Sequence, residues 1–283
     1  MPKLDFDPEE PLIFPPLVEI EMSSEEFMTS IQNTPVPPGQ TALWFLGQNS
    51  WILKSDQGRL VATDPYLTDF CASQRTRVPT PKSRLLPVFI EPEDLQVDVV
   101  LITHSHCDHC DPFTLERLSI KETAKFLAPF QAVEVLKGAG IGASRIHLMH
   151  PLQTWKDLGM EVIGCFAEPT DHTDLNHMGF TLRFEGGKLY YNSGDTAKTE
   201  LLGHVAAWKP EVMSICINGG YHNLSHWEAA EIAALIKPRV AIPAHYDMFP
   251  HNLQPPHMFR KSLFQLARDV DYHRMKYYEP YFF

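Results

Sequence analysis

The feature that most constrains this chain is a buried strand that runs directly into a cluster of histidines. The segment VDVVLIT (97–103) is an almost continuous apolar run, which is typical of a strand covered on both faces. Three histidines and an aspartate follow at once in HSHCDH (104–109). Loops at strand ends are where a rigid sheet can aim ligand-binding side chains. The pattern therefore predicts a sheet-based fold with a functional site beyond this strand.

The spacing within the cluster predicts two neighbouring sets of ligands. His104 and His106 are two residues apart, so in an extended backbone both imidazoles point to the same side. Asp108 and His109 follow once the chain begins to turn, and they face a different direction. Imidazole nitrogens together with a carboxylate are typical ligands of Zn²⁺ or Mn²⁺. One short loop can therefore supply two adjacent metal positions.

The remainder of the chain alternates strand-like and helix-like segments in two rounds. Short β-type runs begin at Thr41 and are separated by the turn signals GQN and DQG. In the second half, SHWE (225–228) is a capping box that opens a predicted helix, and a last amphipathic helix follows near the C-terminus. Two strand-rich stretches, each followed by helices, predict two packed sheets with helices outside, a four-layer α/β arrangement.

The domain organisation is expected to be simple. Residues 1–40 contain many prolines around one helix-like patch, which predicts an N-terminal arm packed on the body. Residues 41–283 contain no linker-like stretch and are expected to form a single domain.

Composition excludes several classes of function. The chain has 24 basic and 35 acidic residues, a net charge of −11, whereas nucleic-acid binding needs clustered Lys and Arg. No apolar run approaches the ~18 residues needed to span a bilayer, and the N-terminus lacks the features of a secretory signal. An odd, sparse set of cysteines predicts reduced thiols: Cys71, Cys107, Cys110, Cys165 and Cys216. We therefore expect a cytoplasmic protein without nucleic-acid partners or stable membrane insertion.

The histidine cluster, written His104-x-His106-x-Asp108-His109, resembles the signature of the metallo-β-lactamase superfamily. Further matching pieces occur in order between about residues 41 and 250, with Asp64 in ATDPYL, Asp195 in YYNSGDT and His245 in AIPAHYD. The resemblance implies a four-layer αββα sandwich, a catalytic domain over residues 41–283, and one or two divalent ions, Zn or Mn, per chain. The metal ligands that it implies are His104, His106, Asp108, His109, His172, Asp195 and His245.

The resemblance also implies individual roles. Asp195 matches the carboxylate that bridges two metals, Asp64 matches an acidic residue behind the ligands, and Asp108 and Asp195 are the catalytic candidates. The third histidine of the first site is expected in EPTDHTDLNHMGF. His172, seven residues before Gly179, fits the superfamily's spacing, whereas His177 abuts the next strand and is expected to pack or hydrogen-bond.

A finer resemblance is to the L-ascorbate-6-phosphate lactonase group, carried by ALWFLGQNSWILKS, FIEPEDLQVDVVLITHSHCDH, NSGDT and VAIPAHYDMF. It implies that a metal-activated water hydrolyses a small phosphorylated lactone. The same segments resemble the N-acylphosphatidylethanolamine phospholipase D group, where a histidine commonly stands in place of Gln48, so a phosphodiesterase is the alternative. A non-catalytic metal-binding regulatory protein is an alternative of another class, but it would be expected to have lost ligands.

Several polar residues outside the ligand set are candidates for substrate contact. Arg75, Arg77 and Arg84, with Lys82, lie in a long polar loop and could receive a substrate phosphate, and His222 follows a strand that should end near the metals. Cys107 and Cys110 form Cys-x-x-Cys, but without a second pair or a thioredoxin-like context they are expected to be buried neighbours of the site. The expected partner is a small-molecule substrate, and a homo-oligomer is left open.

Overall fold

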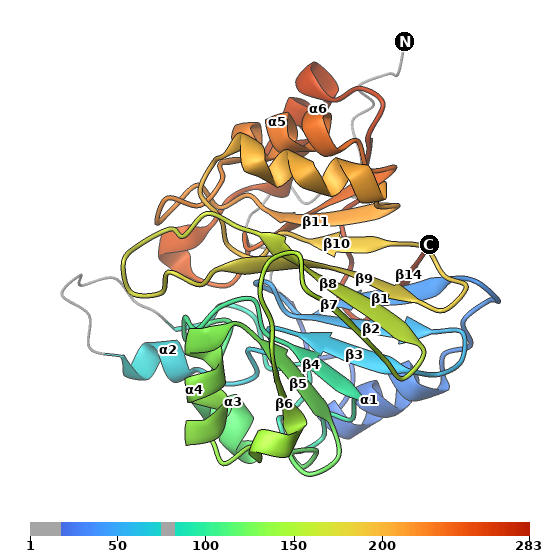
Figure 1. Ribbon diagram of the computed structural model, residues 1–283, viewed down its shortest axis with the longest axis vertical. Coiled ribbons are helices and arrows are strands. Elements are labelled where there is room, and N and C mark those ends of the chain that lie inside the picture. The colour runs from blue at the N-terminus through green and yellow to red at the C-terminus, as the bar shows by residue number, and fades with distance from the viewer. Residues whose placement is uncertain (1–17, 75–82) are drawn as a thin grey trace.

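The computed structural model describes residues 18–74 and 83–283 (Figure 1). Two seven-stranded sheets lie face to face, with α5 and α6 outside one sheet and α1, α3 and α4 outside the other. The four-layer αββα fold predicted from the sequence is confirmed.

The first sheet has the strand order β14-β1-β2-β3-β4-β5-β6. β1, β2 and β3 form antiparallel hairpins at the predicted GQN and DQG turns, whereas β3 to β6 run parallel. The strands are β1 (Thr41–Phe45), β2 (Trp51–Ser55), β3 (Leu60–Thr63), β4 (Val99–Leu101), β5 (Lys125–Ala128), β6 (Ile146–Leu148) and β14 (Tyr281–Phe282).

The second sheet has the order β13-β12-β11-β10-β9-β8-β7. β7 to β10 are antiparallel, and β10 to β13 are parallel. The strands are β7 (Thr154–Asp157), β8 (Met160–Phe166), β9 (Met178–Phe184), β10 (Tyr190–Asn192), β11 (Val212–Cys216), β12 (Val240–Ala244) and β13 (Asp271–Tyr272).

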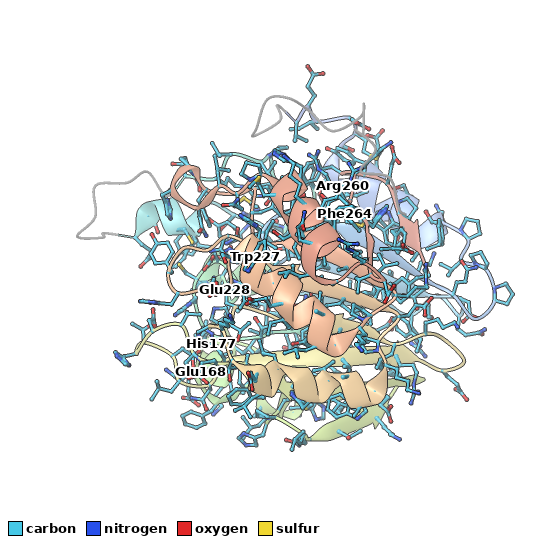
Figure 2. All side chains as sticks on the ribbon, turned by 90° about the horizontal axis from the view of Figure 1, so that it is seen from above. Glu168, His177, Trp227, Glu228, Arg260 and Phe264 are labelled. Carbon is cyan, nitrogen blue, oxygen red and sulfur yellow. The ribbon has the colours of Figure 1, made fainter. Side chains whose placement is uncertain are left out.

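The helices cover the outer faces of both sheets. In Figure 2, α5, which carries Trp227 and Glu228, lies beside α6, which carries Arg260 and Phe264. The predicted capping box is present, because Ser225 Oγ accepts from Glu228 N and the Glu228 carboxylate accepts from Ser225 N. The helices are α1 (Ser24–Asn33), α2 (Phe70–Ser73), α3 (Pro112–Arg117), α4 (Phe130–Gly138), α5 (His226–Ile236) and α6 (Pro256–Leu266), with 3₁₀ helices η1 (Ala143–Arg145), η2 (Glu200–Trp208) and η3 (Pro250–Asn252).

The central strands of the first sheet are mostly apolar because both faces of this sheet are covered. Along β1, Leu43 and Phe45 point into the core between the sheets, whereas Ala42 and Trp44 join a second core under the outer helices. Successive side chains of a strand point to opposite faces, so a doubly covered strand needs apolar residues at every position. α1 belongs to the second core through Phe27 and its neighbours.

The parallel strands bring all the predicted ligand segments to one edge of the molecule. Asp64 follows β3 and His104 follows β4, and these two strands are parallel. Asp195 follows β10 and His245 follows β12, which lie in the parallel part of the second sheet. His177 precedes β9, which is antiparallel to β10 and therefore begins at the same edge. Ligand sites in α/β folds commonly form beyond the carboxyl ends of parallel strands.

Two features were not expected from the sequence. The C-terminal β14 adds an antiparallel strand beside β1, and residues Glu200–Trp208 form the 3₁₀ helix η2. Residues 1–17 of the predicted arm lie outside the described residues. No helix within 18–74 or 83–283 is long and apolar enough to cross a membrane.

Candidate metal centre

The first ligand cluster consists of three histidines. His104 Nε2 lies 2.9 Å from His106 Nδ1, and the ring of His177 lies with its centroid 4.0 Å from that of His104. One nitrogen from each ring lies within 4.8 Å of the others, so the three can hold one ion. The amide of Met178 donates to the carbonyl of Thr103 at 3.0 Å, and this hydrogen bond between the sheets brings His177 to the cluster.

The structure places His177, and not the expected His172, beside the other two histidines. His172 is exposed and belongs to none of the groups of potential ligands among the described residues, whereas His177 is buried between His104 and His106. The reason is that His177 abuts β9, whose first residue is bonded to Thr103 directly before the histidine cluster. The sequence spacing used to choose His172 contains no information about this long-range bond.

The second cluster combines Asp108, His109 and His245, with Asp195 beside them. Asp108 Oδ2 lies 3.4 Å from His245 Nε2 and 3.7 Å from His109 Nε2. The two carboxylate oxygens of Asp195 lie 3.3 Å from His109 Nε2 and from His245 Nε2. Two nitrogen or oxygen ligands of one tetrahedral zinc ion, each at ~2.1 Å, are about 3.4 Å apart. The spacings therefore fit a shared cation.

Asp195 lies between the two clusters. Its carboxylate is within reach of His104 and His109 as well as His245. Gly194 allows this position, since a Cβ there would lie 2.9 Å from Thr103 Cβ, and its φ of 58° is one that glycine adopts without strain. The arrangement is the one expected of a carboxylate that bridges two ions.

Unpartnered polar atoms support metal binding at this centre. His109 Nε2, His177 Nε2 and Asp195 Oδ1 are buried and make no hydrogen bond within the described part of the chain, although His109 Nε2 and Asp195 Oδ1 lie 3.3 Å apart. The other ring nitrogens of the two histidines are engaged, His109 Nδ1 with Asp64 at 2.8 Å and His177 Nδ1 with the Asp195 carbonyl at 3.1 Å. Buried polar atoms are normally satisfied, so these lone pairs aimed at one another fit divalent cations in chemistry and position.

The clustered His and Asp side chains shift one another's pKa values. Burial opposes ionisation of Asp195, but His245 and His109 outweigh it and keep the pKa of this carboxyl well below its usual range. Burial likewise lowers the pKa of His245, yet Asp195 and Asp108 raise it to about 9. Burial and the nearby His109 hold the pKa of His104 well below its usual value, so this ring is neutral, as a metal ligand must be. Burial also lowers the pKa of His109, but Asp195 and Asp108 outweigh it and hold this pKa well above its usual value. Cation binding is therefore expected to displace protons from His109 and His245.

Asp64 holds the ligand loop from behind. Its carboxylate accepts from the His109 ring at 2.8 Å and from the amide and hydroxyl of Thr103 at 2.7 and 2.6 Å. Asn49 Nδ2 donates to it at 2.7 Å. A carboxylate on the far nitrogen of a ligating histidine fixes the tautomer and orientation of the ring. Asp64 therefore lies behind the loop that carries His104 and His109.

Gln48 contacts the centre directly. Its Nε2 donates to Asp108 Oδ2 at 2.6 Å and lies 2.8 Å from His245 Nε2. Gln48, Asp64 and His245 all have positive φ values, 57°, 41° and 57°. Non-glycine residues in this conformation are costly and cluster at functional sites. The bond from His245 N to the Gln48 carbonyl at 2.6 Å helps to hold both residues there.

A cavity of about 220 Å³ opens onto the centre. Ligand-cluster members on its wall are His106, Asp108, Asp195 and His245. The other lining residues include Cys71, Cys107, Thr170, Asp171, Thr173, Tyr221, Asn223, Phe249, His251 and Asn252. No lysine or arginine among the described residues lines it.

The predicted substrate contacts are largely not supported. Arg75 and Arg77, with Lys82, lie outside the described residues. His222 is exposed and does not line the cavity, whereas its neighbours Tyr221 and Asn223 do.

Arg84, which was expected to contact substrate, is instead hydrogen-bonded to the backbone of its own region. Its guanidinium donates to four backbone carbonyls, those of Tyr66, Thr68, Leu86 and Pro87, at 2.8 to 3.0 Å. These hydrogen bonds connect the segment after β3 to the segment before β4. They engage the guanidinium nitrogens with backbone carbonyls, so the side chain is not directed toward the cavity. The positive charge that suggested anion binding instead organises the loop.

Arg84→Met is expected to lower the free energy of unfolding by about 2–4 kcal/mol, because several carbonyls lose their donor together. Denaturant unfolding measures the change. Arg183→Met is the matched control, because Arg183 makes a surface ion pair with Glu161 and should cost less than about 1 kcal/mol. A rise in KM without loss of stability in Arg84→Met would instead return Arg84 to substrate binding.

Two asparagines extend the centre beyond the residues predicted from the sequence. Asn223 Nδ2 donates to Asp195 Oδ2 at 2.6 Å, and Asn252 Nδ2 lies 3.2 Å from His245 Nδ1. Asn223 lies between β11 and α5, and Asn252 is the last residue of η3. No local sequence pattern at either place distinguishes an orienting amide from a solvated one. Only their position in space identifies them.

Fold and site together define an αββα protein with candidate metal-binding clusters of His and Asp side chains at one edge of its two sheets. A family model described as β-lactamase superfamily domain matches residues 42–245. An Aeropyrum pernix protein named UPF0173 metal-dependent hydrolase is 30% identical, covering 78% of this chain and 88% of its own length, and a Caldivirga maquilingensis protein of the same name is 31% identical, covering 64% and 78%. Igni18, a metallo hydrolase from Ignicoccus hospitalis, shares the fold, with a TM-score of 0.68 and 21% identity over 86% of this chain and 98% of its own.

The chain therefore belongs to the metallo-β-lactamase superfamily, in the family of the UPF0173 metal-dependent hydrolases.

Proposed function

We propose that this protein is a metal-dependent hydrolase whose substrate is a small lactone or related ester, with a phosphorylated lactone as the first candidate. The observation that carries the proposal is the convergence of seven His and Asp side chains beneath a cavity of about 220 Å³. The family's name as metal-dependent hydrolases supports the reaction class.

The size of the cavity supports a small substrate over a lipid. Pockets for drug-sized molecules occupy roughly 300–1,000 Å³, so about 220 Å³ suits a single sugar-sized ring. A phospholipid headgroup with acyl chains would need a larger apolar surface beside the metals. The described lining offers Phe249 and Tyr221 but also several polar side chains.

The phosphate of the proposed substrate would need a partner of positive charge. The metals can supply part of it, because bound cations are the largest local charges in such a site. Arg75 and Arg77 remain the predicted side-chain partners. This part of the proposal is therefore tested separately from the hydrolysis itself.

The seven side chains could be divided between two metal ions. His104, His106 and His177 would hold one ion, Asp108, His109 and His245 a second, and Asp195 would lie between them. Divalent ions in such a centre lower the pKa of a coordinated water and polarise the bond to be broken.

Other residues of the chain orient the two carboxylates, and one carboxylate is placed to transfer a proton. Gln48 holds the Asp108 carboxylate at 2.6 Å, and Asn223 holds Asp195 at 2.6 Å. The Asp108 side chain is 20% exposed and lines the cavity, whereas the Asp195 side chain is 7% exposed, so Asp108 is better placed to pass a proton to a leaving oxygen. Asn223 Oδ1 has no partner and can accept a hydrogen bond from a substrate hydroxyl.

A turnover panel tests the proposal. Metal-loaded protein is incubated with neutral lactones, phosphorylated lactones, simple esters and phosphodiesters, with Asp108→Asn as the blank for contaminating hydrolases. We expect the highest kcat/KM for a lactone, and a lower KM for its phosphorylated form. Turnover confined to phosphodiesters would replace the proposal with the phosphodiesterase alternative.

A further inference from the structure

Two cysteines far apart in sequence meet at the wall of the cavity. Cys71 in α2 and Cys107, between the ligands His106 and Asp108, place their Sγ atoms 3.1 Å apart. All five cysteines of the chain are free thiols in this structure. A disulfide needs an S–S distance of ~2.05 Å, so the pair is about 1 Å from bond formation.

The structure pairs Cys107 with Cys71 and not with its Cys-x-x-Cys neighbour. Cys110 is buried, with its Sγ 4.0 Å from the carbonyl of Ala132. Both Cys71 and Cys107 line the cavity, and Cys107 is the more exposed of the two. A small oxidant that enters the substrate cavity therefore meets Cys107 with Cys71 already beside it.

We propose that Cys71 and Cys107 form a reversible disulfide that switches off turnover at the adjacent centre. The bond is a modification of the cavity wall, made by a peroxide and broken by a dithiol reductant. The loss of turnover rests on the proposed function, whereas formation of the disulfide does not.

The chemistry balances with hydrogen peroxide as the oxidant. The Cys107 sulfur attacks one peroxide oxygen, the O–O bond breaks, and the products are a sulfenic acid and water. The Cys71 sulfur then attacks the Cys107 sulfur, the S–O bond breaks, and the second oxygen leaves as water. The two thiols lose two electrons and two protons, and the peroxide is reduced to two waters.

The new bond would move the ligand loop. Cys71 is 3% exposed, and its backbone amide donates to the buried Tyr66 hydroxyl at 3.3 Å. Closing the gap of about 1 Å draws the Cys107 side chain toward Cys71, and we expect the flanking residues His106 and Asp108 to shift with it. A misplacement of this size in a catalytic site can lower the rate by about 10²-fold.

The experiment uses the full-length, metal-loaded protein before and after hydrogen peroxide. Peptide mapping by mass spectrometry under non-reducing conditions identifies the disulfide without reference to activity. We expect a Cys71–Cys107 link, a fall in turnover of at least about tenfold, and recovery with dithiothreitol. The turnover of Cys107→Ser should be the same before and after peroxide treatment. Cys165→Ser, which changes another buried cysteine, should lose turnover with peroxide as the wild type does.

The outcomes separate the two claims. Absence of a Cys71–Cys107 link, or a Cys107–Cys110 link in its place, overturns the proposal whatever the activity. A link formed without loss of turnover overturns the switch. If the reduced protein hydrolyses nothing in the panel, the proposed function and the switch both fail, while the mapping still decides whether the disulfide forms.

Discussion

Asp108→Asn is expected to lower kcat/KM by at least about 10³-fold, equivalent to about 4 kcal/mol of transition-state stabilisation. The substitution preserves the size of the side chain but removes a charged ligand from the second cluster and the group placed to exchange a proton with the leaving oxygen. Steady-state kinetics on the best substrate of the panel measures the loss.

The matched control is Asp171→Asn, which removes another carboxylate from the wall of the same cavity. Asp171 lies 3.5 Å from His106 Nε2, on the side of the ring away from His104, and its side chain is 44% exposed. It should cost less than about tenfold. Equal losses in both variants would mean that Asp108 acts only through the charge of the cavity, and retained turnover in Asp108→Asn would remove the metal mechanism.

His177→Ala is expected to lower kcat/KM by at least about 10²-fold and to reduce metal binding, whereas His172→Ala should have almost no effect. The two histidines lie in one loop. The same substitution at both positions therefore tests the effect of position alone. His177 lies against His104 and His106, and His172 is exposed.

Metal titration by calorimetry, with circular dichroism to confirm the fold, accompanies the kinetics of both variants. In His177→Ala the titration should show one bound metal ion fewer than in the wild type, because the site of His104 and His106 has lost its third histidine. His172→Ala should bind metal as the wild type does. If His172→Ala carried the loss, the loop would have to rearrange when metal binds, and the sequence-based choice of His172 would be restored.

The sequence predicted most of the fold and of the centre because the relevant signals are local. The apolar run at 97–103 forms the doubly covered strand β4, and the histidine cluster follows it as expected. Ligands in short motifs at strand ends, such as Asp195 and His245, could be placed because parallel strands end at a common edge.

The errors concern contacts between distant segments. His177 reaches the centre through a bond between Met178 and Thr103, and Cys107 meets a cysteine 36 residues away rather than its near neighbour. Arg84 has the charge of an anion-binding residue, but burial turns its donors toward carbonyls of its own loop. These contacts cannot be predicted from sequence spacing or residue type, because only the tertiary packing determines them.

Elemental analysis of the protein purified without chelator, followed by chelation and metal add-back, tests metal binding at this centre most directly. We expect one or two bound equivalents of a divalent metal, zinc or manganese, that are lost together with turnover and restored together. Asp195→Ala, which removes the carboxylate between the clusters, should bind less metal than the wild type under the same conditions. Protein that holds no divalent metal, binds none on titration and still turns over its substrate would contradict the central claim.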